Sequence, residues 1–154
     1  MQKFLNYLSF QGRTNRARYW LTTLAIFGIT MVCAVSAASA ATLLPFLGIV
    51  LIPVFVVVLY ASLANAARRL HDRGKSAWWL LLFAVLPALL SIPAQMTKGS
   101  SDEGAQMFGA MFALLSLPFS VWGFVEIGCL RGTSGPNRFG DDPLVSTQAE
   151  EVLA

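Results

Sequence analysis

The side chains that could perform chemistry lie in three short polar segments, which long apolar runs separate. The middle segment, residues 68–79, carries the only histidine, His71, directly before Asp72. A histidine beside a carboxylate can serve as an acid–base pair, because imidazole titrates near neutral pH. Such a pair is also found as a structural link at a helix end. We keep both interpretations open and predict no catalytic residue.

The three polar segments also share arginine. Guanidinium groups bind phosphate oxygens through paired hydrogen bonds, so a pocket between the segments would suit a phosphate-bearing headgroup or metabolite. The candidate pocket residues are Arg13, Arg16, Arg68, Arg69, His71, Asp72, Asn137, Arg138 and Asp142. The alternative is anchoring alone, in which arginines bind lipid phosphates and tryptophans lie at the membrane interface. The interfacial anchors would be Trp20, Trp78 and Trp79.

Several classes of site find no support in the sequence. There is no glycine-rich phosphate loop, no H-E-x-x-H motif and no G-x-S-x-G motif, and no second histidine stands near His71. We therefore predict no metal and no cofactor. The two cysteines, Cys33 and Cys129, are expected at different membrane depths, where they would be small buried hydrophobic residues and not a disulfide.

The apolar runs between the polar segments decide the class of protein. The chain is 56% hydrophobic and 12% charged, and its charges are clustered. No Asp, Glu, Lys or Arg occurs in residues 19–67, 76–97 or 104–125. A bilayer core needs about 20 apolar residues in a helix, so the first run accommodates two spans and the others one each. The sequence predicts an all-α integral membrane protein with four transmembrane helices.

The predicted spans are residues 19–40, 46–66, 77–95 and 105–129 within a single membrane domain, residues 1–145. Residues 1–10 have the apolar spacing of a short interfacial helix, and residues 146–154 are predicted to form a flexible tail. The small residues at 36–41 resemble a signal-peptide cleavage site. A second apolar run follows almost at once, so we expect the first helix to remain uncleaved.

The distribution of cations predicts the orientation. Lys and Arg accumulate on the cytoplasmic side of membrane proteins. Ten of the eleven Lys and Arg residues fall in the N-terminal segment, the middle loop and the C-terminal segment, whereas Lys98 alone falls in the remaining loops. Both termini are therefore predicted to be cytoplasmic. A positive charge at this surface matches anionic phospholipid, and it gives no reason to expect nucleic acid.

The three polar segments together resemble the signature of domain-of-unknown-function family 805, a group of small bacterial inner-membrane proteins. The first block of the resemblance is Phe10, Gly12, Arg13, Arg16, Tyr19 and Trp20. The second block is Arg68, Arg69, Leu70, His71, Asp72, Trp78 and Trp79. The third block is Gly132, Thr133, Gly135, Asn137, Arg138, Phe139, Gly140, Asp142 and Pro143. The resemblance implies a bacterial inner (plasma) membrane location and no established activity.

The third polar segment is predicted to fold back onto the other two. Asp141 and Asp142 directly follow a run of turn-forming residues, and Phe139 would prefer an apolar niche under the loops. We predict that Asp142 pairs with Arg16 or Arg69 and that Asn137 bonds backbone groups. Glu126, the one carboxylate predicted inside a span, needs a cationic partner, for which the candidates are Arg69 and Arg131.

These observations favour a non-enzymatic structural or interaction protein with a cationic and aromatic cytoplasmic surface. The first alternative is a binder or small transporter of an anionic, phosphate-bearing lipid or metabolite. The second is a membrane enzyme that acts on lipid headgroups through His71 and Asp72. The expected partners are the bilayer and its anionic headgroups, together with another copy of the chain or a second membrane protein.

Overall fold

Long apolar helices make up the structure, a computed structural model that describes residues 8–43 and 47–145. The helices are α2 (Arg16–Leu43), α3 (Leu47–Asp72), α4 (Leu86–Met96) and α5 (Glu103–Phe124), with π-helical turns η1 (Leu81–Val85) before α4 and η2 (Val125–Cys129) after α5. Within these ranges the only β pairing is one isolated bridge between Asn137 and Gly140. The predicted all-helical class is confirmed.

Three of the helical segments are long and apolar enough to cross a membrane. They are Arg16–Ala38, Leu51–Asp72 and Glu103–Cys129, and a shorter apolar helix covers Leu81–Met96. All four coincide with predicted spans, although α3 runs to residue 72 and not to 66. The prediction ended this span before the first charge, whereas the helix continues because its charged side chains find buried partners.

The expected interfacial helix and tail lie largely outside the described residues, since residues 1–7 and 146–154 are not among them.

Local chemistry explains where several helices begin and change. The Asn15 side chain accepts a hydrogen bond from the backbone N–H of Arg18, 2.8 Å away, as a residue that caps a helix start does. Asp102 does the same for α5 through the N–H of Gly104 at 2.9 Å. At η1, Pro87 has no N–H to donate to the previous turn, and the N–H of Leu86 instead bonds the carbonyl of Leu81.

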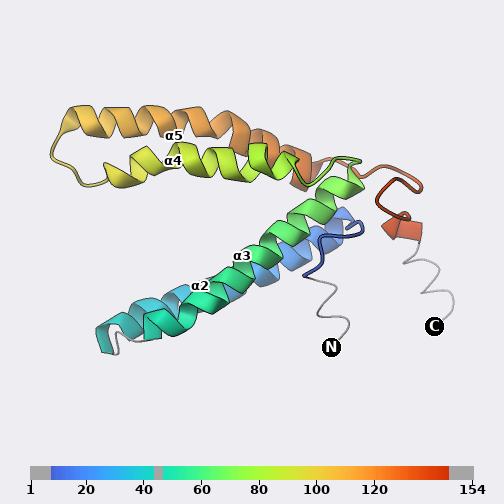
Figure 1. Ribbon diagram of the computed structural model, residues 1–154, viewed down its shortest axis with the longest axis horizontal. Helices are drawn as coiled ribbons and strands as arrows, with labels where there is room; N and C mark the ends of the chain where they lie inside the picture. Colours follow the sequence, from blue (N-terminus) through green and yellow to red (C-terminus); the bar gives the residue numbers. More distant parts are fainter. Residues whose placement is uncertain (1–7, 44–46, 146–154) are drawn as a thin grey trace.

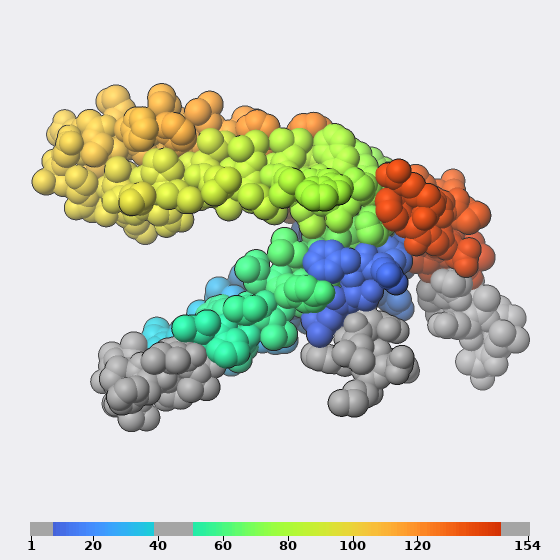
Figure 2. Space-filling model, in the orientation of Figure 1, coloured from blue at the N-terminus to red at the C-terminus, as the bar shows by residue number. Residues whose placement is uncertain are grey.

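The helices pair into two hairpins that meet at one end only. Figure 1 shows α2 beside α3 and α4 beside α5, with the two pairs diverging away from a shared junction. The buried apolar core lies at this junction and consists of Ala67, Leu70, Leu80, Phe83 and Ile127. Figure 2 shows the segment after η2, in red, lying over the same end of the molecule. The polar segments therefore surround the place where the hairpins join.

Glycines permit the closest helix contacts near this junction. A Cβ added at Gly123 would lie 2.9 Å from Cβ of Phe83, and one at Gly128 would lie 2.8 Å from Cζ2 of Trp20. Both distances are shorter than van der Waals contact, so neither position tolerates a side chain without movement of its neighbour. Small residues have this use in membrane helices, where packing replaces the hydrophobic effect between helices.

Replacing Gly123 by alanine should therefore lower the stability of the purified protein. Overpacking of a tight contact costs about 1–3 kcal/mol, and thermal unfolding in a mild detergent would measure the loss. Gly28→Ala in α2 is the matched control, because nothing lies within 4 Å of the added methyl group. Equal melting temperatures for the two variants would show that the contact at Gly123 carries no packing constraint.

Candidate functional site

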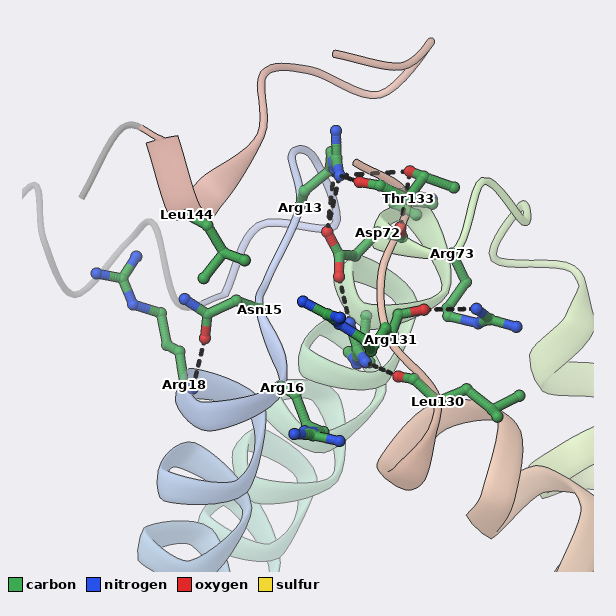
Figure 3. Close-up of polar contacts among 12 residues, drawn as sticks. Arg13, Asn15, Arg16, Arg18, Asp72, Arg73, Leu130, Arg131, Thr133 and Leu144 are labelled. Carbon is green, nitrogen blue, oxygen red and sulfur yellow. Dashed lines mark hydrogen bonds and ion pairs between the residues drawn. The ribbon is translucent and has the colours of Figure 1, made fainter. Parts of the chain in front are cut away.

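The three polar segments predicted from sequence, residues 10–20, 68–79 and 131–143, come together at the junction of the hairpins. We call this assembly the polar cap. Its centre is the carboxylate of Asp72, which is only 3% exposed. Nε and Nη2 of Arg13 lie 3.1 and 3.0 Å from Oδ1 of Asp72, and Arg69 pairs with Oδ2 through Nη1 (Figure 3). One buried carboxylate is thus held by two buried guanidinium groups.

The same guanidinium groups bind the chain that leaves the last helix. The final carbonyls of a helix lack intrahelical partners and must be satisfied by other donors. Arg69 donates to the carbonyl of Ile127 at 3.0 Å and also to that of Leu130. Arg13 donates to the carbonyls of Thr133 and Gly135, each at 2.6 Å. The two arginines therefore connect Asp72 to the end of η2 and to the segment beyond it.

Two neighbours of Asp72 complete this connection. Thr133 donates to the backbone carbonyl of Asp72 twice, from its N–H at 2.8 Å and from its hydroxyl at 3.0 Å. Gly132 passes so close that any side chain at this position would overlap the Asp72 carboxylate. The glycine requirement at residue 132 is therefore steric, and it depends on the position of the buried acid.

A second ion cluster lies around Glu126, which is 5% exposed. Its Oε1 lies 3.1 Å from Nη2 of Arg73 and 3.2 Å from Nζ of Lys75. The predicted partners, Arg69 and Arg131, were wrong. Arg69 is committed to Asp72, one helical turn away in the same helix, and Arg73 and Lys75 reach Glu126 from the turn after α3.

The predicted fold-back of residues 135–143 is confirmed. The ring of Phe139 stacks on His71 with 4.0 Å between centroids and a 5° interplanar angle. The amide nitrogen of Asn137 donates to the backbone carbonyl of His71 at 3.0 Å, as expected for a residue that bonds backbone groups. Stacking and main-chain hydrogen bonds thus hold the segment on the end of α3.

Asp142 does not make the contacts that were predicted for it. Its carboxylate accepts hydrogen bonds from the backbone N–H of Gly135 at 2.9 Å and of Leu144 at 3.0 Å, and it bonds neither Arg16 nor Arg69. These bonds, first that of Leu144, lower the pKa of Asp142 below its ordinary value of 3.8. Asp142 therefore closes the turn within its own segment, whereas Arg13 supplies the link to the rest of the cap.

His71 and Asp72 have separate partners. Nδ1 of His71 lies 3.1 Å from the carbonyl oxygen of Gly12, so this nitrogen must carry the proton and donate. The carboxylate of Asp72 faces Arg13 and Arg69 instead. Among the described residues no hydrogen bond joins His71 to Asp72, and no group of His, Cys, Asp and Glu gathers that could hold a metal.

The other candidate residues lie at different depths. Arg68 is buried and donates to the carbonyl of Ala64 at 3.3 Å. Arg16 and Arg138 are exposed, and each donates to one backbone carbonyl, of Cys129 and of Gly74 respectively. Arg138 also lies over the ring of Phe139, 4.6 Å from its centroid.

The three tryptophans predicted as anchors also differ in their surroundings. Trp78 is 77% exposed and faces outward. Trp20 instead donates from Nε1 to the carbonyl of Gly128 at 3.0 Å, and Trp79 stacks on Phe83. Trp79 also lies edge-on to Trp122 of α5 with 6.0 Å between ring centroids, so two of the three make defined contacts between helices within the protein.

Two residues that contribute to this end of the molecule, Arg73 and Asn65, were not singled out as site residues from the sequence, and Gly132 and Thr133 were only matched to the family pattern. Asn65, which is 2% exposed, donates to the backbone of Tyr19 and to the hydroxyl of Thr23, both at 3.2 Å. It joins α2 to α3 one helical turn before Arg69. A lone amide in an apolar run, spaced by four residues from an arginine, was the available signal.

Comparison with known proteins identifies a family that matches this chain. Residues 7–141 match the family described as "Protein of unknown function (DUF805)". The chain belongs to this family. It is 31% identical over 140 residues to the inner membrane protein YhaI of Escherichia coli K12, covering 90% of this chain and 88% of that protein. It is 29% identical over 147 residues to the inner membrane protein YhaH of the same strain, covering 90% and 89%.

A third relative is the uncharacterized protein YiiR of Escherichia coli K12, which is 26% identical over 141 residues and covers 87% of this chain and 85% of that protein. No solved structure matches the chain. The DUF805 match covers all three polar segments apart from the last two residues of the third. Family membership and the apolar helices together identify a multi-pass inner-membrane protein of unknown activity.

Removing the central charge should destabilise the cap. Asp72→Asn leaves Arg13 and Arg69 buried without their counter-charge, which typically costs about 3–5 kcal/mol. Thermal unfolding of the purified protein in mild detergent should show a clearly lower melting temperature. Asp141→Asn, an equal change at an exposed carboxylate without an ion pair in the described chain, should have little effect. A melting temperature that is the same for both variants would contradict the central role of Asp72.

Protonation of Asp142 should release the turn that it closes. Because its folded pKa is depressed, the stabilisation is fully present above about pH 4 and is lost as pH falls through the folded value. Amide hydrogen exchange at Gly135 and Leu144, corrected for intrinsic rates, should accelerate below this pH. Asp142→Asn should show the fast exchange at every pH, and a pH dependence that survives in this variant would assign the effect to another group.

Proposed function

We propose that this DUF805 protein is a four-span inner-membrane protein whose polar cap is structural and does not catalyse a reaction. One observation carries the proposal: the buried guanidinium groups of Arg13 and Arg69 direct their hydrogen bonds to Asp72 and to main-chain carbonyls. Donors committed in this way are not available to a substrate. The cap would fix the two hairpins relative to each other and present a constant surface to its surroundings.

The proposed orientation has both termini and the cap in the cytoplasm. The support is the asymmetry of cations, since ten of eleven Lys and Arg residues belong to the N-terminal segment and the cap-side segments. The shorter helix Leu81–Met96 would span about 24 Å at 1.5 Å per residue. It would cross the bilayer as the partner of α5, because the two helices pack along their lengths.

Single cysteines test the orientation in intact cells. In a background with Cys33 and Cys129 replaced by alanine, a membrane-impermeant maleimide should label Ser101→Cys, in the loop between α4 and α5. It should not label Ser134→Cys in the cap until the membrane is permeabilised. Labelling of Ser134→Cys from outside would reverse the proposed topology.

A pair of variants tests whether His71 is structural or catalytic. If it is structural, its value lies in stacking on Phe139, an interaction worth about 0.5–1.5 kcal/mol. His71→Gln and Phe139→Leu should then lower the melting temperature similarly and leave the cellular phenotype that the gene supports intact. Loss of that phenotype in His71→Gln alone, at unchanged protein level and melting temperature, would favour an enzyme.

Binding of an anionic, phosphate-bearing molecule is the second candidate function. The observation in its favour is that two arginines at the edge of the cap, Arg16 and Arg131, are exposed and line a cleft. Unlike the buried arginines, they have N–H donors that make no hydrogen bond.

Transport of an ion through the spans has weaker support, because no charged residue occurs in residues 19–67, 76–97 or 104–125.

A further inference from the structure

A polar cleft of about 530 Å³ opens beside the first turn of α2. Arg16 lines it from the helix and Arg131 lines it from the segment after η2 (Figure 3). The guanidinium group of Arg131 has no partner among the described residues, and Arg16 uses a single bond, from Nη1 to the carbonyl of Cys129 at 3.1 Å. Two exposed cationic groups with unused donors therefore border the same space.

The acidic side chains of this cleft are already engaged. Asp72 lies against Arg13 and Arg69, and Asp142 accepts the N–H groups of Gly135 and Leu144. Hydrogen bonds from backbone N–H groups leave Asp142 charged, but the lining sets three arginines, Arg16, Arg69 and Arg131, against two acids, so the net charge of the cleft is positive. The start of α2, a helix of 28 residues, adds the partial positive charge of its dipole at Asn15 and Ala17, which also line the cleft.

An apolar groove of about 900 Å³ runs along α2 and α3 from the same end of α2. Its walls include Leu21, Ala25 and Ile29 from α2 and Val54, Val57 and Ala61 from α3. Asn15 and Ala17 line both the groove and the cleft, so both spaces border the first turn of α2. Arg18 lies at the polar end of the groove, on the side of α2 away from Arg16 (Figure 3).

We infer that the cleft and the groove together bind one anionic phospholipid. The headgroup phosphate would lie between Arg16 and Arg131, since guanidinium groups hold phosphate oxygens in two-point fashion. An acyl chain would follow the groove past Ala25 and Val57, and Arg18 would face the rest of the headgroup. This inference goes beyond the structural function proposed above and rests on the same placement of the cap at the membrane surface.

The charge at the end of the groove selects a lipid over a second copy of the chain. A helix of another copy would have to present acids to Arg16, Arg18 and Arg131. Within the described helices the acids are either paired in the cap, as Asp72 and Glu126 are, or lie at the start of α5, as Glu103 does. Asp141 and Asp142 lie in the segment after η2 and not on a helix that could enter the groove. An anionic phospholipid carries a phosphate and an acyl chain in the order in which the cleft and the groove follow each other.

Native mass spectrometry of the full-length protein tests the polar half of the site. The protein is supplied with equal amounts of phosphatidylglycerol and phosphatidylcholine in mild detergent. Wild type should retain one phosphatidylglycerol, and Arg16→Gln/Arg131→Gln should retain about tenfold less, as expected when about 1.4 kcal/mol of binding is lost. Arg138→Gln, an equal charge change on the cap outside the cleft, should remain within about twofold of wild type.

A second pair of variants tests the apolar half. Ala25→Trp fills the groove and should reduce phosphatidylglycerol retention to the level of the double arginine variant. Leu24→Trp, at an exposed neighbour that does not line the groove, should retain the lipid. Equal retention in both tryptophan variants, together with displacement of the lipid by millimolar inorganic phosphate, would show a site for free phosphate and overturn the lipid assignment.

Two further outcomes would also overturn the inference. One is equal retention of the two lipids by wild type, and the other is unchanged retention in Arg16→Gln/Arg131→Gln. If the double variant fails to fold, Arg131→Gln alone serves, because its side chain has no hydrogen bond or ion pair to lose within the described chain, and it should still lower retention by several-fold. Lipid retention in detergent is independent of orientation and of catalysis, so failure here is distinguishable from failure of the proposed function.

Discussion

The buried carboxylate of Asp72, held between Arg13 and Arg69, is the interaction on which the rest of the structure depends. Taking a carboxylate and two guanidinium groups out of water is costly, and it is sustained only where further hydrogen bonds satisfy the remaining donors. Here the remaining donors bind the carbonyls of Ile127, Leu130 and Thr133. The charge cluster and the end of the last helix therefore stabilise each other.

This arrangement solves a problem that every membrane helix has at its ends. Backbone carbonyls that water cannot reach must find other donors, and a loop at membrane depth is tolerated only when it is buried in protein. Arginine suits the task because its donors form a rigid fork that reaches several acceptors at once. Arg13 and Arg69 thus supply hydrogen-bond donors to carbonyls at the end of η2 and in the segment after it, and the two hairpins, which touch little elsewhere, are joined through the polar cap.

The sequence predicted the parts of this structure that depend on residue type. Charge-free runs located the four apolar helices, and the turn chemistry around Phe139 correctly indicated that residues 135–143 fold back. Partner choice could not be predicted, because it depends on distances between elements. Asp142 accepts hydrogen bonds from nearby main-chain N–H groups, and Glu126 forms ion pairs with Arg73 and Lys75. Gly132 was matched to the family pattern, but its steric role became visible only once Asp72 was placed beside it.

The cap also determines the order in which the protein can be completed during its synthesis. Arg13 bonds the carbonyls of Gly135 and Gly140, so the contact joins residues that are more than 120 positions apart. Each hairpin is held together by contacts between its own neighbouring helices, so both can form before the segment after η2 is added. The buried charges of Arg13 and of the end of α3 still need the carbonyls of the segment after η2. Synthesis of residues 131–140 is thus required before the cap can join the two hairpins.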